Sequence, residues 1–282
     1  MVYLKNEELT VEINEIGAEL FSIKTKEGKE CIWNGDPQFW KGHAPNLFPL
    51  TGRLRDNKYI FEGKEYTLLS HGFAKNMEFE VNKKSNSCAE FTIHETEETL
   101  EKFPFKFTFK IIFTLEGRSV NVTYSVDNDN EKMMYFCVGG HEGYMCEGGI
   151  ENYYIEFDKN VTLDTYTIAG PIITRETTRI LENSNILPLK NEYFVPDALV
   201  FRDIDFDGLT IKKNDGTFNV RVDFKNHPHL LMWMVPGAPY ICIEPWYGFP
   251  DFTDSNYIIE EKVGIQKLEA GKNFTCTHSM TF

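Results

Sequence analysis

Alternating apolar and polar residues dominate this chain and predict β-strands along much of its length. Between residues 105 and 115 every second residue is Phe, Ile or Leu, and most residues between them are polar. The same pattern returns over residues 120–126, after a turn at 116–118 and before the turn-rich run 127–130. Side chains two residues apart lie on the same face of a strand, so we expect a hairpin with one buried face.

Short strands are also predicted elsewhere, and helical patterns are nearly absent. The further strands cover residues 9–13, 59–61, 79–81, 89–93, 153–157, 218–224, 230–234 and 274–282. Only residues 95–102 have the composition of a short acidic helical turn, and no Ser-, Gly- or Pro-rich linker divides the chain. Many strands joined by turns are typical of a β-sandwich or barrel, so we expect one large antiparallel all-β domain over residues 1–282.

Composition and charge exclude several classes of partner and location. An aromatic content of 14%, with 23 Phe and 13 Tyr, agrees with a strand-rich protein. The net charge of −14 argues against nucleic acid and anionic membranes as partners, because both need basic patches. The first residues have neither a basic region nor an apolar one, so we expect no signal peptide, and no apolar run approaches the about 20 residues of a bilayer span. Six cysteines without a C-x-x-C pair indicate reduced thiols, so we expect a cytoplasmic protein.

One carboxylate stands in unusually apolar surroundings. Glu244 follows a short apolar strand and precedes Pro245 and Trp246. Loss of water raises the pKa of such an acid toward the working range of a general base, and the Trp246 ring suits the apolar C–H face of a sugar. The plainer alternative is a solvated glutamate at the end of a strand. Alternation also predicts that Cys242 shares a face with Glu244, while residues 241 and 243 point into the core.

Polar residues among glycines mark three further segments. Arg53 follows a glycine and offers a planar fork of donors for a hydroxyl or an anion. His71 precedes a glycine, where the backbone can bend sharply. His141 follows Gly139 and Gly140 where an apolar strand ends, and imidazole exchanges protons near neutral pH. The plainer alternatives are a surface arginine and hydrogen-bonded structural histidines.

Other catalytic chemistries lack their motifs. The chain has no H-E-x-x-H, no Cys/His quartet, no G-x-S-x-G and no glycine-rich phosphate or dinucleotide loop. The nearest histidine pair, His227 and His229, flanks a proline and suggests a turn. We therefore expect no metal and no cofactor. One acid, two histidines and an arginine remain, which suits proton transfer on a polar, neutral ligand.

Taken in order, these segments resemble the aldose 1-epimerase (galactose mutarotase) superfamily, and in particular its LacX-like branch. The matching motifs are N-L-F-P-x-x-G-R ending at Arg53, H-G-F-A-K from His71 to Lys75, G-G-H ending at His141, D-A-L-V-F starting at Asp197, and I-C-I-E-P-W-Y-G around Glu244. Each motif is modest alone, but the ordered set runs across most of the chain and is specific.

The resemblance implies a large antiparallel β-supersandwich with a sugar cleft, and it implies roles for the residues. Glu244 would remove the proton from the anomeric hydroxyl, and His141 would protonate the ring oxygen. The opened aldehyde would rotate and reclose on its other face with the two roles reversed. His71 and Arg53 would bind hydroxyls or polarise the ring oxygen, and Asp197 would anchor another hydroxyl. No metal or nucleotide would be required.

Two features leave the substrate open. Better characterised galactose mutarotases follow the acid histidine with an aromatic-Asn segment, whereas residues 142–144 here are Glu-Gly-Tyr, so sugar specificity does not transfer. Lys75 and Arg55 lie near His71 and Arg53 in sequence, in the region where related hexose-6-phosphate epimerases hold a phosphate. The expected ligand is therefore a small sugar, either a hexose or a hexose 6-phosphate.

Two other functions stay open on the same residues. A carbohydrate-binding or sensing protein would use the same fold without catalysis, because fold alone does not determine function. A glycosidase would pair Glu244 with Asp197 or Asp251, but the two histidines would then have no purpose. A homodimer is expected only from the frequency of dimers among soluble proteins.

Overall fold

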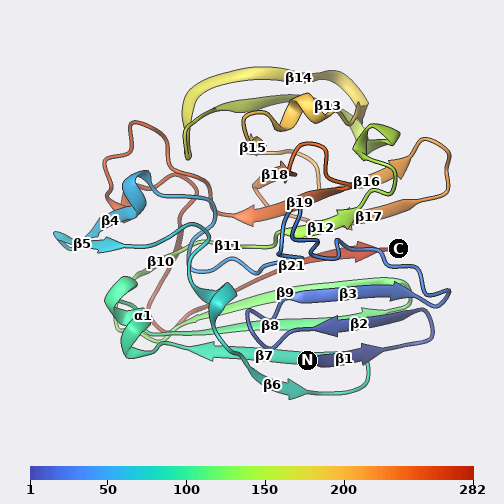
Figure 1. Cartoon of the computed structure of the whole chain (residues 1–282). Helices are drawn as coiled ribbons and strands as arrows, with labels where there is room; N and C mark the ends of the chain where they lie inside the picture. The colour runs from blue at the N-terminus through green and yellow to red at the C-terminus, as the bar shows by residue number, and fades with distance from the viewer.

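The computed structural model describes all 282 residues and consists almost wholly of antiparallel strands (Figure 1). Nine strands form the larger sheet in the order β14-β13-β16-β17-β21-β9-β8-β7-β6. Their bounds are β6 Glu80–Lys83, β7 Cys88–His94, β8 Phe107–Glu116, β9 Ser119–Asn128, β13 Tyr153–Ala169, β14 Ile172–Pro188, β16 Gly208–Lys213, β17 Asn219–Asp223 and β21 Asn273–Thr281. The prediction of an antiparallel all-β fold is confirmed.

A smaller, five-stranded sheet packs against the larger one and carries the residues of interest. It has the order β11-β19-β18-β15, and β12 also pairs with β19. The bounds are β11 Val138–Gly139, β12 Glu142–Met145, β15 Ala198–Arg202, β18 His229–Trp233 and β19 Tyr240–Tyr247. Small sheets complete the fold: β1 Val2–Lys5 with β2 Leu9–Ile13 and β3 Leu20–Thr25, β4 Lys58–Phe61 with β5 Lys64–Thr67, and β10 Met134–Phe136 with β20 Gln266–Leu268.

The hairpin predicted from strict alternation forms β8 and β9. Glu116 pairs with Ser119 across a two-residue turn, and the apolar side chains of both strands point to one buried face. That face belongs to a core cluster of 72 buried residues between the sheets. A strand with this pattern can bury one face only if a second layer covers it. The hairpin therefore forms part of one layer of the sandwich, with its apolar face toward the core.

The predicted helical turn is α1, Glu97–Lys102. It begins with a capping box, in which the Thr99 backbone N–H donates to the Thr96 hydroxyl and the Thr96 N–H donates to the Thr99 hydroxyl. These bonds satisfy backbone donors that a helix start leaves free. No helix in the structure is long and apolar enough to cross a membrane. All six cysteines are free thiols, as predicted.

A long hairpin extends far beyond its predicted strand. The pattern predicted a strand over residues 153–157, but β13 and β14 each continue for 17 residues. Only Tyr153–Phe157 pair with β16, and the register shifts after Glu156, where the alternation breaks down. The rest of the hairpin arches over β15, β18 and β19 (Figure 1). Most of its outer residues are exposed, so they lack the apolar alternation that reveals a buried strand.

The sequence placed Glu244 at a strand end, and this is wrong. Glu244 lies inside β19, which continues through Pro245 to Tyr247. A proline removes one ladder donor and is normally excluded from a central strand. Here the neighbouring ladder is interrupted, because residues 140 and 141 lie between β11 and β12 and belong to neither. The Pro245 carbonyl still accepts from the Gly140 N–H at 3.4 Å.

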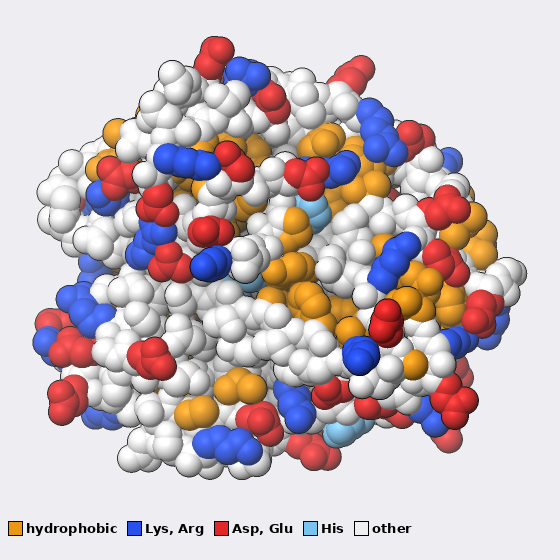
Figure 2. Space-filling view, turned by 180° about the vertical axis from the view of Figure 1, so that it is seen from behind, with side chains coloured by type: hydrophobic (Ala, Val, Ile, Leu, Met, Phe, Trp, Pro, Cys, Tyr) orange, Lys and Arg blue, Asp and Glu red, His pale blue; other side chains and the backbone are white.

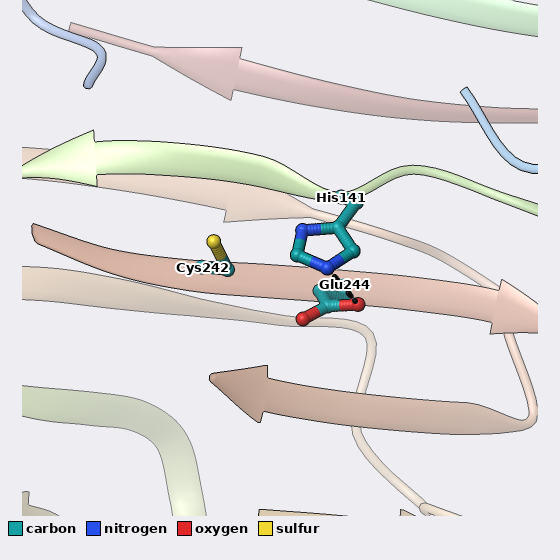
Figure 3. Close-up of side chains that lie close together, drawn as sticks. All are labelled: His141, Cys242 and Glu244. Atoms are coloured by element: carbon teal, nitrogen blue, oxygen red, sulfur yellow. Dashed lines mark ion pairs between the residues drawn. The ribbon is translucent and has the colours of Figure 1, made fainter. Parts of the chain in front are cut away.

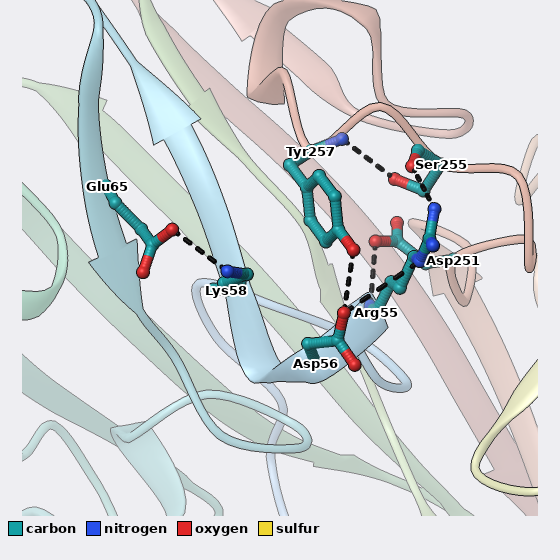
Figure 4. A network of polar contacts seen from close by, with 7 residues as sticks. All are labelled: Arg55, Asp56, Lys58, Glu65, Asp251, Ser255 and Tyr257. Atoms are coloured by element: carbon teal, nitrogen blue, oxygen red, sulfur yellow. Dashed lines mark hydrogen bonds and ion pairs between the residues drawn. The ribbon is translucent and has the colours of Figure 1, made fainter.

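A buried ion pair fixes Asp251, which in turn bonds to a loop distant in the sequence. The Lys262 ammonium lies 2.7 Å from Asp251, and both side chains are at least 95% buried. Asp251 also accepts from the Arg55 N–H at 3.0 Å (Figure 4). The Asp251 N–H donates to the Arg53 carbonyl. The pair therefore holds the loop that carries Arg53.

Replacing Lys262 with Met should destabilise the protein by about 3–5 kcal/mol, because it leaves the Asp251 carboxylate buried without a charged partner. Urea denaturation measures the change. Lys58→Met serves as a control, because the Lys58–Glu65 pair is exposed and such pairs add little stability. An equal effect of the two substitutions would contradict the buried pair. Asp251→Asn combined with Lys262→Met should recover part of the loss.

Candidate active site

A cavity of about 340 Å³ opens on the face of the five-stranded sheet that points away from the main core. The sheet forms its floor, loops form one wall, and Ile168, Ile172 and Ile173 at the tip of the β13–β14 hairpin form another. The volume lies within the range of about 300–1,000 Å³ that is usual for small-ligand sites. On the surface seen from behind, acidic and basic side chains are interspersed and hydrophobic side chains gather toward the middle (Figure 2).

Strand register explains the floor of the cavity. Leu231 on β18 lies opposite Glu244 on β19, and Val200 on β15 lies opposite Leu231. Residues that are paired in this way share a face of the sheet. The same face carries Trp233 and Trp246, so two indole rings flank the carboxyl group. A floor of apolar and aromatic groups with one acid suits the mixed surface of a sugar.

The structure brings seven of the residues proposed from the sequence into this one cavity. They are Glu244, His141, Arg53, His71, Asp197, Trp246 and Lys75. Arg55 does not join them, because its guanidinium donates to the Ser255 carbonyl and stacks over Tyr257 (Figure 4). Asp251 is likewise engaged with Lys262 and lies outside the cavity lining. A glycosidase that uses Asp251 as its second acid therefore lacks the required geometry.

His141 and Glu244 form the centre of the site. His141 Nε2 lies 3.4 Å from Glu244 Oε2, and the two side chains are 10% and 2% exposed (Figure 3). Cys242 lies beside them on the same face of β19, as alternation predicted. Ile241 and Ile243 are buried in the main core, also as predicted. The pair is thus a carboxyl and an imidazole in contact at the base of a cavity.

Two glycines allow the backbone before His141 to fit. A side chain on Gly139 would collide with the Trp246 ring, and a Cβ on Gly140 would lie 2.5 Å from Glu142 Oε2. The Trp246 indole N–H donates to the Gly140 carbonyl at 2.9 Å. Close approach of other groups, rather than an unusual turn, therefore requires Gly at both positions. This contact positions His141 over Glu244.

Aromatic rings remove water from His141. Its ring centroid lies 5.1 Å from that of Trp40 and 5.6 Å from that of Trp233. Burial disfavours the imidazolium and lowers the pKa of His141 to about 3. The sequence did not single out Trp40 or Trp233. Trp40 lies in a loop that comes well before His141 in the sequence. The only signal for a role of Trp40 or Trp233 in the site would have been a tryptophan close to polar residues.

The carboxyl group is shifted in the opposite direction. Burial is the main cause that raises the pKa of Glu244 well above its usual value, and the negative charges of Glu142 and Asp197 add to it. Both shifts favour neutral groups, so the His141–Glu244 pair holds one proton near neutral pH. Because the two groups interact, their protons belong to the pair rather than to either residue.

His71 completes the polar wall as a neutral donor. Its backbone is left-handed, with φ of +64°, and its N–H donates to the Gly52 carbonyl at 2.9 Å. The Gly52 N–H in turn donates to His71 Nδ1 at 3.3 Å, which leaves the proton on Nε2. Burial is the main cause that lowers the pKa of His71 well below its usual value, and the neighbouring His141, Lys75 and Arg53 add to the effect.

The rim carries charges of both signs. Arg53 is exposed, and Lys75 is half-buried, with its ammonium donating to the Ser70 carbonyl at 3.0 Å. Burial and the nearby Arg53 lower the pKa of Lys75. Asp197 is half-buried at the start of β15 and also lines the cavity. A ligand would therefore meet cations and a carboxylate at the rim, and the His141–Glu244 pair, which has no net charge, at the bottom of the cavity.

Residues 1–252 match the family model described as aldose 1-epimerase. The chain belongs to the aldose 1-epimerase family. Protein LacX from a plasmid of Lactococcus lactis subsp. lactis is 31% identical over 281 residues, which cover 95% of this chain and 94% of that relative. The predicted LacX-like resemblance is confirmed.

Solved structures agree with this aldose 1-epimerase family assignment. A galactose mutarotase related enzyme from Lactobacillus acidophilus matches with a TM-score of 0.94 at 31% identity, over 99% of this chain and 96% of that chain. A galactose mutarotase-like protein from Lactobacillus casei ATCC 334 also has a TM-score of 0.94, at 30% identity over 100% and 99%. The predicted galactose mutarotase-like supersandwich is therefore confirmed.

The central residues of this family member could also approach a metal ion. Donor atoms of His141, Cys242 and Glu244 lie within 4.8 Å of one another. Bonds to zinc of about 2.0–2.3 Å would require these atoms to move closer together. Proton transfer needs only the imidazole and the carboxyl group, which already lie in contact.

Replacing His141 with Asn should flatten the pH dependence of stability. The unfolded imidazole takes up its proton near pH 6.5, whereas the folded one does so near 3. Its contribution is therefore present above about pH 6.5 and is lost as the pH falls toward 3. Between pH 7 and 5 the unfolding free energy of the wild type should fall by about 2 kcal/mol more than that of the variant. Urea denaturation at both pH values measures this, and equal changes would contradict a buried, neutral His141.

Proposed function

We propose that this protein is an aldose 1-epimerase that interconverts the α and β anomers of a hexose or a hexose 6-phosphate without a cofactor. The observation that carries the proposal is the buried His141–Glu244 contact at 3.4 Å in a cavity of sugar size. Ring opening removes one proton from the anomeric hydroxyl and supplies one to the ring oxygen. A pair that holds one proton and has two sites for it meets both needs.

The roles follow from the order of proton movements. The step starts from the form of the pair in which the shared proton lies on His141 and Glu244 is ionised. Glu244 takes the proton of the anomeric hydroxyl, and His141 donates the shared proton to the ring oxygen as the C1–O5 bond breaks. The carbonyl carbon then rotates, and the ring recloses on its opposite face while the two residues exchange roles. The pair ends with the one proton with which it began, so each cycle is balanced. The apolar surroundings strengthen both transfers, because little water competes for the protons.

Neighbouring residues hold the sugar during this exchange. The Nε2–H of His71 and the guanidinium of Arg53 donate to hydroxyl oxygens or to the ring oxygen, and Asp197 accepts from a hydroxyl. Trp246 covers an apolar face of the ring. Such contacts keep the reacting oxygens near the His141–Glu244 pair, which is the main contribution that positioning makes to catalysis.

The rim favours testing phosphorylated sugars beside neutral ones. Arg53 and Lys75 are the two cations that line the cavity, and a cation pair can hold a phosphate through charge-assisted hydrogen bonds. The second candidate function is a sugar-binding protein without catalysis, since every contact with hydroxyls would serve binding equally well. The contact between His141 and Glu244 favours the enzyme, because binding needs no shared proton.

Glu244→Gln and His141→Asn should each lower the rate of anomer exchange by at least about two orders of magnitude, the usual effect of losing a positioned acid or base. NMR saturation transfer and polarimetry on α-glucose, α-galactose and their 6-phosphates measure the rate. Glu116→Gln is a matched control, since Glu116 lies exposed at the β8–β9 turn, and it should leave the rate unchanged.

The outcomes separate the candidate functions. Sugar binding without accelerated exchange would favour the binding protein, and equal rates for the wild type and Glu244→Gln would refute catalysis. Lys75→Met should slow only the 6-phosphates if a phosphate binds at the rim.

A further inference from the structure

A second buried acid–histidine pair lies directly behind the first. Glu142 follows His141 in the sequence but points to the opposite face of the sheet, where it shares a register position with Ile243. Its Oε1 lies 2.7 Å from His278 Nε2, and the two side chains are 2% and 0% exposed. Glu142 belongs to β12 and His278 to β21, so this pair spans the sandwich from one sheet to the other.

Glu142 also contacts the backbone that leads into the active site. Its carboxyl group packs against Gly140, where no side chain fits. On the same residue, the Gly140 carbonyl accepts from Trp246. The peptide that carries His141 is therefore held from the core by Glu142 and from the cavity by Trp246.

Stability gives a poor account of this pair. Glu142 Oε2 and His278 Nδ1 are both buried without a hydrogen-bond partner. A buried acid–base pair with unsatisfied atoms is costly, and well-packed apolar side chains often replace such pairs without loss of stability. A contribution to the stability of the core therefore does not explain the presence of the Glu142–His278 pair.

Several titratable groups face the Glu142–His278 pair. Tyr124 on β9, Tyr144 on β12, and Cys242 and Glu244 on β19 all feel the charge of Glu142, and His227 lies with its ring centroid 6.2 Å from that of His278. Around Glu244 the titratable groups are His141, Asp197, Cys242 and Tyr240. Among the groups that face Glu142, only Glu244 exchanges a proton in the proposed reaction.

We propose that Glu142 is a positioning residue for the epimerase: held by His278, it fixes the Gly140–His141 backbone and sets the electrostatic potential at the Glu244 carboxyl group. This inference rests on the proposed function. Its consequence is that a negative charge behind the catalytic pair increases the affinity of that pair for its proton. Removal of the charge should shift the proton affinity of the pair, which a purely structural contact would leave unchanged.

The test is the pH–rate profile of Glu142→Gln, which keeps the size of the side chain and its hydrogen bond to His278. Both the acidic and the basic limb of the pH–rate profile should move to lower pH by about one unit, because the pair binds its proton less tightly without the nearby negative charge. The kcat should fall about tenfold with little change in KM, because His141 is less well placed. Tyr124→Phe is the control: it removes the hydrogen bond to Asn46 from the same part of the core, and both limbs should stay in place.

Unchanged limbs in Glu142→Gln would overturn the proposal, as would an equal shift in Tyr124→Phe. If Glu142→Gln does not fold, the double variant Glu142→Gln/His278→Gln removes the same charge and supplies two amides that can bond to each other, and it must show the same shift. Carbon-13 NMR of the Glu244 carboxyl, assigned with Glu244→Gln, follows the titration without turnover. Loss of epimerase activity and loss of electrostatic coupling are thereby distinguished.

Discussion

The site depends on burying a carboxyl group and an imidazole side by side on one face of a strand whose other face belongs to the main core. Glu244 and His141 touch at 3.4 Å under a cover of indole rings. Burial is the main cause that drives their pKa values apart, one upward and one downward. Two groups that each resist ionisation then share one proton, which is the property that reversible ring opening requires. Exposure of either group to water would remove that property.

The rest of the structure offsets the free-energy cost of burying these two titratable groups. Buried titratable groups are destabilising unless their surroundings fix them. Two glycines let Trp246 and Glu142 approach the backbone before His141 from opposite sides. On the opposite wall, the buried Lys262–Asp251 pair holds the loop of Arg53, and the backbone bonds between His71 and Gly52 join that loop to the next. These contacts tie three separate segments around the site to one another.

Prediction from the sequence succeeded where a local pattern is sufficient. Strict alternation identified β8 and β9, and the acidic run from residue 95 identified α1, because burial of one face and capping depend on near neighbours. It missed most of the β13–β14 hairpin, whose exposed face has no apolar period, although that hairpin forms a wall of the cavity. It also ended the strand at Glu244, since a proline normally stops a central strand and the interrupted ladder beside Pro245 is not visible in the sequence.

The sequence by itself determined the chemical inventory: which residues can exchange protons or bind hydroxyls, and which face of β19 Glu244 and Cys242 share, because alternation is a property of the strand alone. Only the tertiary structure decided which of these groups meet. It brought residues 53, 71, 141, 197 and 244 into one cavity and turned Arg55 and Asp251 away. It also supplied the Trp40 and Trp233 cover and the Glu142–His278 pair behind the site. The reason is physical: desolvation and charge coupling act through space, over segments that the packing of two sheets brings together.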